Sequence, residues 1–408
     1  MKLRALIHAS ELITGAGVSQ KDGRHITEED LGAIPDGALV YSTKVVQGKT
    51  LPHKVIWTGK TSELPRRFAK IPKKNLRMKH SLIPGFVDCH THLVFAGNRA
   101  DEFAARCGGA TYQQIAEKGG GILKTVRATR EATEKQLEAL AVERVKKSAS
   151  YGVRTFEIKS GYGLDFETEL KILSVIKRLK TRFPEYTFSS TFLGAHAFPP
   201  EQSREAYMRE ILEHMLPEVA RKKLADCCDV FIDAGYYTLA EGRAILQKAR
   251  ALRLQTRMHA DELANTESAA LAAELGSLSA DHLLRISDRS ITKLAPSNTV
   301  AVLLPGTAFY LKAPHAPARK LIEAGACVAL ATDFNPGTCM CLSLPTIMTI
   351  AALYLGMSRA EILSAVTYSG AKALGLQSRK GSLEKGKDAD FAVLPFSSFE
   401  EAYYRFAW

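Results

Sequence analysis

Two histidines one residue apart, His90 and His92, follow the apolar run at residues 82–87. Side chains at positions i and i+2 of an extended strand point to the same face, so the two imidazoles should project together. Neutral imidazoles at the carboxyl end of a strand can hold a divalent metal ion. The motif is short, and two surface histidines with no role in metal binding could have the same spacing. Its interpretation therefore depends on the residues downstream.

Three later segments place a histidine or an aspartate directly after an apolar, strand-like run. They are Met-His-Ala-Asp-Glu-Leu at 258–263, Ser-Ala-Asp-His-Leu at 279–283 and Ala-Leu-Ala-Thr-Asp-Phe-Asn-Pro-Gly-Thr at 329–338. Three histidines and one aspartate form a typical ligand set for Zn²⁺, and Fe²⁺ or Mn²⁺ would also fit. We therefore predict a divalent ion that lowers the pKa of a bound water towards neutrality.

Two further residues have the chemistry to assist such an ion. Glu262 lies three residues beyond His259 and suits a general base, although a first-turn helix carboxylate is the alternative. His282 could donate to a developing oxyanion, although it could equally be a core histidine. No lysine ends the strand-like run at 229–233, so a carbamylated lysine bridging two ions is not indicated and one ion is favoured.

The elements that must position these residues alternate between strand and helix from residue 82 onwards. The expected strands are 82–87, 152–159, 187–195, 229–233, 255–260, 278–282, 299–304 and 327–332. The expected helices are 131–150, 167–180, 203–224, 239–252, 266–275, 287–295, 316–324 and 344–368. Eight alternating units predict an α/β fold, a (β/α)8 TIM barrel whose active site lies at the carboxyl ends of its strands.

The two ends of the chain have a different pattern, with short β-prone runs separated by Gly, Pro and Asp. Residues 1–81 and 375–408 are expected to form a small β-sandwich-like domain, and 82–374 the barrel.

The chain of 408 residues carries a formal net charge of +12, and basic residues gather at 65–80. This cluster contains no nucleic-acid-binding motif, so a solvated loop is favoured and no nucleic-acid partner is expected. A positive field would attract a small anionic substrate. No run approaches the roughly 18 apolar residues of a membrane span, and no signal peptide is indicated, so we expect a cytoplasmic protein without a membrane partner.

The seven cysteines are scattered without a Cys-x-x-Cys pair, which also fits a reducing compartment. Cys339 and Cys341 could form a soft metal-binding pair, but this is the less favoured interpretation.

The segment Pro-Gly-Phe-Val-Asp-Cys-His-Thr-His-Leu-Val-Phe-Ala-Gly-Asn-Arg at 84–99 resembles the first strand of the metal-dependent amidohydrolase superfamily. Four further motifs narrow the resemblance: Gly-Gly-Gly-Ile at 119–122, Lys-Ser-Gly-Tyr-Gly-Leu at 159–164, Phe-Leu-Gly-Ala-His at 192–196 and Asp-Phe-Asn-Pro-Gly-Thr at 333–338. They are similar to the branch that opens 4-imidazolone-5-propanoate to N-formimidoyl-L-glutamate in histidine degradation. The similarity covers about residues 82–395 and implies a homodimer.

The resemblance assigns roles to individual residues. It implies that His90, His92, His259 and Asp333 bind the metal, and that Arg99 and Tyr162 hold the substrate, with the guanidinium on its carboxylate. His196 and Glu262 would contact the ring, while Asn335, Gly337 and Thr338 would grip substrate or product. Catalysis would fall to Glu262, His282 and Asp333, the last assisting proton transfer to the leaving nitrogen. From residue chemistry alone, Tyr162 could be a packing residue and Arg99 a surface ion pair.

Two other functions remain open at this point. Another amidohydrolase, such as a cytosine- or guanine-type deaminase, would share the metal ligands but not the anion-binding Arg99 and Tyr162. A basic nucleic-acid-binding or scaffolding protein with an inactive barrel is the alternative from a different class, and the intact ligand set disfavours it.

Overall fold

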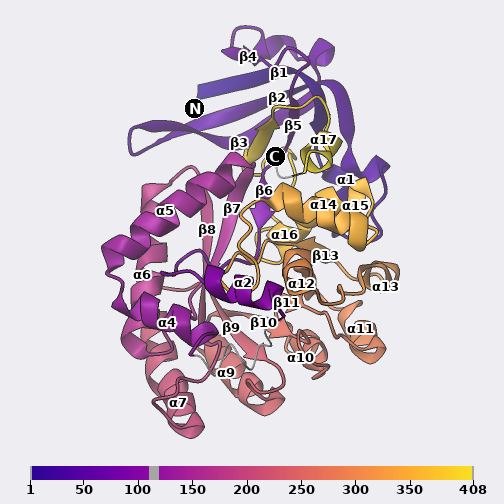
Figure 1. The fold of residues 1–408 in the computed structure, drawn as a ribbon. Helices are drawn as coiled ribbons and strands as arrows, with labels where there is room; N and C mark the ends of the chain where they lie inside the picture. The colour runs from indigo at the N-terminus through magenta and orange to yellow at the C-terminus, as the bar shows by residue number, and fades with distance from the viewer. Residues whose placement is uncertain (1, 110–118, 407–408) are drawn as a thin grey trace.

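The computed structural model describes residues 2–109 and 119–406 and contains two separate sheets (Figure 1). The larger sheet has eight parallel strands that pair in chain order. They are β6 (Phe86–Asp88), β7 (Val153–Lys159), β8 (Thr187–Ala195), β9 (Cys227–Ile232), β10 (Gln255–Ala260), β11 (Ser279–His282), β12 (Val300–Leu303) and β13 (Val328–Leu330). Each lies within or beside the range expected from the sequence, so the predicted barrel is confirmed.

The segment after β6 brings the first and last strands of the barrel together. Thr91 forms a parallel bridge with Phe334, beyond the end of β13. The N–H of Asp333 donates to the carbonyl of His90 at 3.0 Å, and the N–H of His92 donates to the carbonyl of Phe334 at 2.9 Å. The backbone of the histidine pair is therefore itself part of the seam that closes the barrel.

Helices connect the strands and cover the outside of the barrel (Figure 1). They are α2 (Ala100–Cys107), α4 (Ile122–Glu131), α5 (Glu134–Ser150), α6 (Phe166–Arg182), α7 (Arg204–Arg209), α8 (Leu216–Arg221), α9 (Leu239–Ala251), α10 (Ser268–Glu274), α11 (Asp288–Leu294), α12 (Pro305–Leu311), α13 (Ala318–Glu323), α14 (Leu344–Tyr354), α15 (Arg359–Val366) and α16 (Tyr368–Lys372). The second half of α5 and most of α6 bury apolar side chains at helical spacing, as the sequence pattern predicts.

Two of the expected helices are interrupted. The helix expected at 203–224 contains a π-helical segment, Glu210–Met215, between α7 and α8. The helix expected at 344–368 ends at Tyr354 and restarts at Arg359. Gly356 has a φ of 62° there, and Ser358 caps α15 through a capping box with Glu361.

The smaller sheet is built from both ends of the chain and lies beside the barrel (Figure 1). Its order is β14-β5-β1-β2-β3, with β4 also paired to β1. The strands are β1 (Lys2–Ile13), β2 (Ala33–Val46), β3 (Lys49–Lys60), β4 (Lys73–Asn75), β5 (Ser81–Pro84) and β14 (Phe391–Leu394). The β-sandwich-like domain expected from the two termini is thus present as one six-stranded sheet, and the helix α17 (Glu400–Tyr404) follows β14. The basic stretch at 65–80 contributes the exposed β4 to it.

The apolar run at 82–87, expected as one barrel strand, is divided between the two sheets. Its first half lies in β5, which pairs with β1 and β14, and its second half lies in β6. Gly85 makes the change of sheet, and a Cβ there would lie 2.7 Å from Cγ of Arg154. Hydrophobicity is similar on both sides of Gly85, so the run gives no sign of the division.

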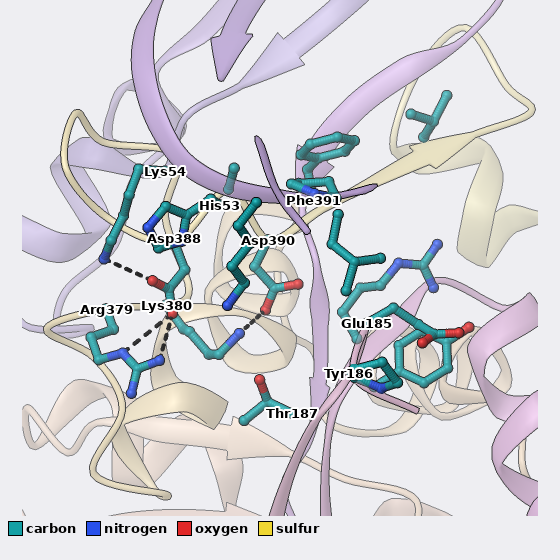
Figure 2. A pocket seen from close by; sticks show the side chains of 17 residues that line it. His53, Lys54, Glu185, Tyr186, Thr187, Arg379, Lys380, Asp388, Asp390 and Phe391 are labelled. Atoms are coloured by element: carbon teal, nitrogen blue, oxygen red, sulfur yellow. Dashed lines mark hydrogen bonds and ion pairs between the residues drawn. The ribbon is translucent and has the colours of Figure 1, made fainter. Parts of the chain in front are cut away.

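A cavity of about 540 Å³ lies between the smaller sheet and the barrel, and Figure 2 shows its charged lining. Lys54 and Arg379 pair with Asp388, and Lys380 pairs with Asp390. Thr187 and Arg154, at or near the starts of β8 and β7, also line it. This cavity is therefore at the opposite end of the strands from the histidines. Among the described helices, none has the length and apolar character needed to span a membrane.

Candidate active site and metal centre

The candidate metal ligands meet at the carboxyl ends of the barrel strands. Nε2 of His90 and Nε2 of His92 lie 3.4 and 3.5 Å from Oδ1 of Asp333. Ligand atoms of His90, His92 and His259 all lie within 4.8 Å of one another, and so do those of His90, His282 and Asp333. These two overlapping sets form one cluster of nitrogen and oxygen donors, which we call the donor cluster.

Two aspartates behind the donor cluster hold its imidazoles. Nδ1 of His90 lies 2.6 Å from Oδ2 of Asp281, and Nδ1 of His259 lies 3.1 Å from Oδ1 of Asp229. A carboxylate only accepts hydrogen bonds, so each Nδ1 carries the proton and each Nε2 is left with a lone pair. Such carboxylates fix the tautomer and the ring orientation of histidines that bind metals.

The donor cluster fits a divalent cation. In the described part of the chain, Nε2 of His90, Nδ1 of His92 and both ring nitrogens of His282 are buried without a hydrogen-bond partner. Leaving such atoms unsatisfied is costly, and a cation held by the donor cluster would satisfy Nε2 of His90. Burial, together with nearby positive groups, lowers the pKa of His90 and His92 well below its ordinary value, so these rings are neutral. Neutral imidazoles and a carboxylate suit zinc or iron.

A cavity of about 500 Å³ opens onto the donor cluster. Its lining consists of His92, Arg99, Glu102, Arg106, Ile122, Tyr162, His196, Phe231, Ala234, Tyr236, His259, Glu262, Leu263, His282, Leu311, Asp333, Asn335, Gly337 and Thr338. All the residues predicted to bind substrate or to act in catalysis are in this set. His90 is fully buried behind the wall. The structure therefore brings the predicted site residues together in one place.

Arg99 approaches the cavity next to a glycine. Its Nε donates to Oε2 of Glu102 at 2.7 Å, and the other oxygen of Glu102 accepts the N–H of Gly121 at 3.1 Å. A Cβ on Gly337 would lie 2.2 Å from Nη1 of Arg99, so a larger residue would displace the guanidinium. Both Nη groups lack a carboxylate partner among the described residues, which leaves them able to bind one from a ligand.

The loop that carries Tyr162 is held by a buried carboxylate. Glu169, on α6, accepts the N–H groups of Gly161, Gly163 and Leu164 at 2.7 to 3.2 Å. Gly161 has a φ of 105°, and a Cβ there would lie 2.9 Å from Nδ1 of His196. The carbonyl of Gly161 instead accepts a hydrogen bond from that Nδ1 at 2.9 Å. The glycines of this motif thus allow the loop to lie against His196.

Asn335 is engaged within its own loop. Its Nδ2 donates to the carbonyl of Asp333 and to Oγ1 of Thr338, both at 2.7 Å. Its Oδ1 accepts the N–H groups of Gly337 and Thr338, both at 2.8 Å. These bonds use both amide hydrogens and both oxygen lone pairs, so Asn335 shapes the loop that presents Gly337 and Thr338.

Glu262 and His282 face each other, with Oε1 and Nδ1 3.5 Å apart. Burial of Glu262, with the nearby carboxylates of Asp333 and Asp233, raises its pKa well above the ordinary value. Asp233 also accepts the N–H of Glu262 at 2.9 Å and so holds its loop. A raised pKa makes the Glu262 carboxylate a stronger base than an ordinary glutamate, which suits it to accept a proton.

Sequence reasoning missed the buried charges beneath the donor cluster: Glu157, Lys159, Asp229, Arg257 and Asp281. A signal was present, because charged residues inside apolar barrel strands are unusual unless they are paired. Neither of the candidate ligand groups found among the described residues includes Cys339 or Cys341.

The model of the amidohydrolase family matches residues 81–403, and this chain belongs to that family. An imidazolonepropionase from Symbiobacterium thermophilum is 46% identical over 395 residues, covering 95% of this chain and 90% of the relative. Another from Clostridium tetani is 42% identical and covers 96% and 92%. Within the amidohydrolases, the chain therefore belongs to the imidazolonepropionases.

Solved structures support the same architecture. A zinc-containing adenosine deaminase from Xanthomonas campestris has a TM-score of 0.69 at 16% identity, over 99% of this chain and 87% of that one. A guanine deaminase from C. acetobutylicum with bound guanine has a TM-score of 0.63 at 16% identity, over 96% and 90%. At this identity the likeness concerns the fold alone.

Proposed function

We propose that this protein hydrolyses the cyclic amide of 4-imidazolone-5-propanoate to N-formimidoyl-L-glutamate. The observation that carries the proposal is that Arg99 and the donor cluster share one cavity, in a chain that belongs to the imidazolonepropionases. A ligand with a ring carbonyl and a carboxylate on a short chain could place the carbonyl at the donor cluster and the carboxylate at Arg99. Cytosine and guanine, the substrates of the alternative deaminases, have no carboxylate that Arg99 could bind.

His90, His92, His259 and Asp333 would hold one divalent ion, zinc or iron. When bound, such an ion acts as a Lewis acid and lowers the pKa of water. Oγ1 of Thr307 donates to Oδ2 of Asp333 at 2.6 Å, and Oδ1 is the oxygen that lies close to His90 and His92. Thr307 therefore orients Asp333 so that one oxygen remains for the donor cluster.

The neighbouring side chains supply the proton transfers. Glu262 takes a proton from the attacking water, and His282 donates to the oxygen of the ring carbonyl as negative charge develops there. As the bond between the carbonyl carbon and the ring nitrogen breaks, Asp333 assists the transfer of the proton held by Glu262 to that nitrogen. These steps need the three groups on one side of the cavity, and all three line it.

The remaining side chains orient the substrate. His196 must donate through Nδ1 to the carbonyl of Gly161, and burial lowers its pKa to about 3, so its neutral Nε2 can accept a ring N–H. Arg99 binds the carboxylate, and Tyr162 closes the cavity beside His92, with ring centroids 5.5 Å apart. Gly337 and Thr338 contact the ligand from the loop that Asn335 shapes.

A product assay tests this function. The zinc-loaded and the iron-loaded protein are each incubated with 4-imidazolone-5-propanoate, cytosine and guanine, and N-formimidoyl-L-glutamate and ammonia are measured. We expect the first product from the first substrate and no ammonia from the other two. Release of ammonia from cytosine or guanine, without ring opening, would identify a deaminase. Full activity after exhaustive chelation would contradict a metal-dependent reaction.

Three finer points belong to the same proposal: which ion is native, a homodimeric state and a cytoplasmic location. Metal analysis of protein purified without added metal would identify the ion. Sedimentation of the full chain would give the oligomeric state, and fractionation of the source cells would give the location.

A further inference from the structure

A layer of buried charged side chains lies directly beneath the donor cluster. It contains three carboxylates and two cations: Glu157, Lys159, Asp229, Arg257 and Asp281, all with fully buried side chains. They come from β7, β9, β10 and β11. Buried charges are tolerated when they are paired and hydrogen-bonded, so the arrangement of this layer is expected to be specific.

The ammonium of Lys159 lies at the centre of the layer. Its Nζ is 3.0 Å from Oε1 of Glu157, 2.7 Å from Oδ2 of Asp229 and 3.8 Å from Oδ2 of Asp281. Burial alone would lower the pKa of Lys159, but Asp229 and Glu157 outweigh it and the pKa lies above its ordinary value. The lysine is therefore charged.

Each of these carboxylates uses another contact to hold a part of the donor cluster. Oδ1 of Asp229 accepts from the backbone N–H and from Nδ1 of His259, both at 3.1 Å. Oδ2 of Asp281 lies 2.6 Å from Nδ1 of His90. Oε2 of Glu157 accepts the N–H of Thr91 at 3.1 Å, between the two histidines of the pair.

Arg257 cannot replace Lys159 in this position. Its Nη2 donates to the carbonyl of Cys89 at 2.7 Å and its Nε to Ser279 at 3.1 Å. Its guanidinium is 3.6 Å from both Glu157 and Asp281, and it has no ion pair with Asp229. Among the described lysines and arginines, Lys159 is the partner of Asp229, and without it that buried carboxylate would keep only its hydrogen bonds from His259 and no cationic partner.

We propose that Lys159 is a positioning residue that sets the metal affinity of the donor cluster, by holding in one arrangement the carboxylates that bind His90, Thr91 and His259. This inference rests on the proposed metal centre. Loss of the lysine would let Asp229 turn away from His259, and the ligands would no longer be aligned in advance. Changes to the outer shell of a metal site typically weaken binding by about 10- to 100-fold.

The test measures zinc binding by the full chain after chelation, in competition with a chromophoric chelator. We expect Lys159→Met and Lys159→Gln each to raise the zinc dissociation constant by about 10- to 100-fold. The matched control is Lys380→Met, which also removes a buried lysine, since Nζ of Lys380 lies 2.6 Å from Asp390 in the cavity at the other end of the barrel (Figure 2). Lys380→Met should leave the zinc dissociation constant within about twofold of the original value.

The outcomes separate the inference from the proposed function. If the unmodified chain binds zinc and the Lys159 variants bind it within threefold, the inference is wrong while the metal centre stands. An equal loss in Lys380→Met would also overturn it, because general destabilisation would then explain the effect. A chain that binds neither zinc nor iron would overturn the metal centre and the inference together.

A measurement on the unmodified chain covers the case in which the Lys159 variants do not fold. Nitrogen-15 NMR of the zinc-free protein distinguishes histidine tautomers. We expect two buried histidines, His90 and His259, to be fixed with the proton on Nδ1. Rings that exchange between tautomers, or that carry the proton on Nε2, would show that the layer does not align them and would overturn the proposal.

Discussion

Gly337 leaves free the space that the guanidinium of Arg99 occupies at the cavity. The guanidinium occupies space that a Cβ at position 337 would take, and Glu102 holds it through Nε alone. Two nitrogens are left for a carboxylate, an arrangement that lysine could not reproduce because its ammonium is not a planar fork. At the residue scale, preference for an anionic substrate therefore depends on Arg99 and on the absence of a side chain opposite it.

The first prediction concerns Arg99→Ala. Because hydrogen bonds to charged groups contribute about 1.5–3 kcal/mol, we expect KM for 4-imidazolone-5-propanoate to rise by roughly 10-fold or more, with a smaller change in kcat. Steady-state kinetics provides the measurement. The control is an analogue whose carboxylate is replaced by an amide, for which the original and variant proteins should have similar KM values. An unchanged KM for the natural substrate would remove Arg99 from carboxylate binding.

The second prediction concerns Glu262→Gln, a change that keeps size but removes the base. Turnover should fall by at least about 100-fold, since general-base catalysis contributes on that order. Metal content should stay near that of the unmodified protein, because the candidate ligand groups do not include Glu262. Metal analysis and kinetics on the same preparation separate the two effects, and a turnover that hardly changes would contradict the assigned role.

At the scale of elements, the loop between β7 and α6 is rigid for a specific reason. Glu169 satisfies three backbone N–H groups that would otherwise be buried without partners. The carboxylate comes from the first turn of α6, and so the helix fixes the loop that carries Tyr162. Glycine gives this loop its shape, and one glutamate holds it there.

The third prediction follows from this loop. Glu169→Ala would leave those N–H groups unsatisfied, each at a cost of about 1–3 kcal/mol, so the free energy of unfolding should fall and KM should rise as Tyr162 moves. Thr133→Ala is the control, because it removes a capping box of α5, far from Tyr162 in the chain, and should cost about 1 kcal/mol without changing KM. Denaturant unfolding and kinetics of both variants distinguish a loop effect from general destabilisation.

The fourth prediction concerns acid stability and α9. Arg204 binds Glu241 in the first turn of this helix and holds the pKa of that carboxyl down to about 2, from an ordinary value of 4.5. A depressed pKa in the folded protein gives stability that is present above pH 4.5 and is lost as the pH falls through about 2. Glu241→Gln should therefore flatten the pH dependence of the free energy of unfolding in this window. Glu213→Gln, at an exposed position, should leave that dependence unchanged.

The elements were largely predictable because hydrophobic periodicity reports burial directly. The strands of the barrel and the helix α6 followed from it. Periodicity could not show that Gly85 divides one apolar run between two sheets, because both halves are buried. The break before α15 was readable, since Gly356, Ser358 and Glu361 form a helix stop and a capping box in the sequence.

The candidate site was predictable only in part. His90 and His92 could be placed together from their spacing, and residues at strand ends could be assigned to one rim of a barrel. The contact between Arg99 and Gly337, and the charged layer around Lys159, depend on residues distant in sequence that meet only after folding. Pairing of this kind leaves no periodic pattern, and so a sequence read along its length does not reveal it.

At the scale of the whole molecule, the donor cluster joins the two edges of the barrel sheet. His90 and His92 follow the first strand and Asp333 follows the last, with His259 opposite. The fifth prediction is that chelation lowers the midpoint of thermal unfolding and that added zinc restores it, because a ligand bound only by the folded state at 100 times its dissociation constant adds about 2.7 kcal/mol. Calorimetry with and without a chelator provides the measurement, and identical midpoints would contradict a bound ion.

The seam formed by Thr91 and Phe334 also bears on how the polypeptide matures during synthesis. The histidine pair leaves the ribosome long before Asp333 is made, and until then it has neither its partner strand nor its carboxylate. An ion that arrives early meets two imidazoles on an unfinished sheet and can exchange freely. The complete set of metal ligands therefore exists only after the nascent chain has closed upon itself.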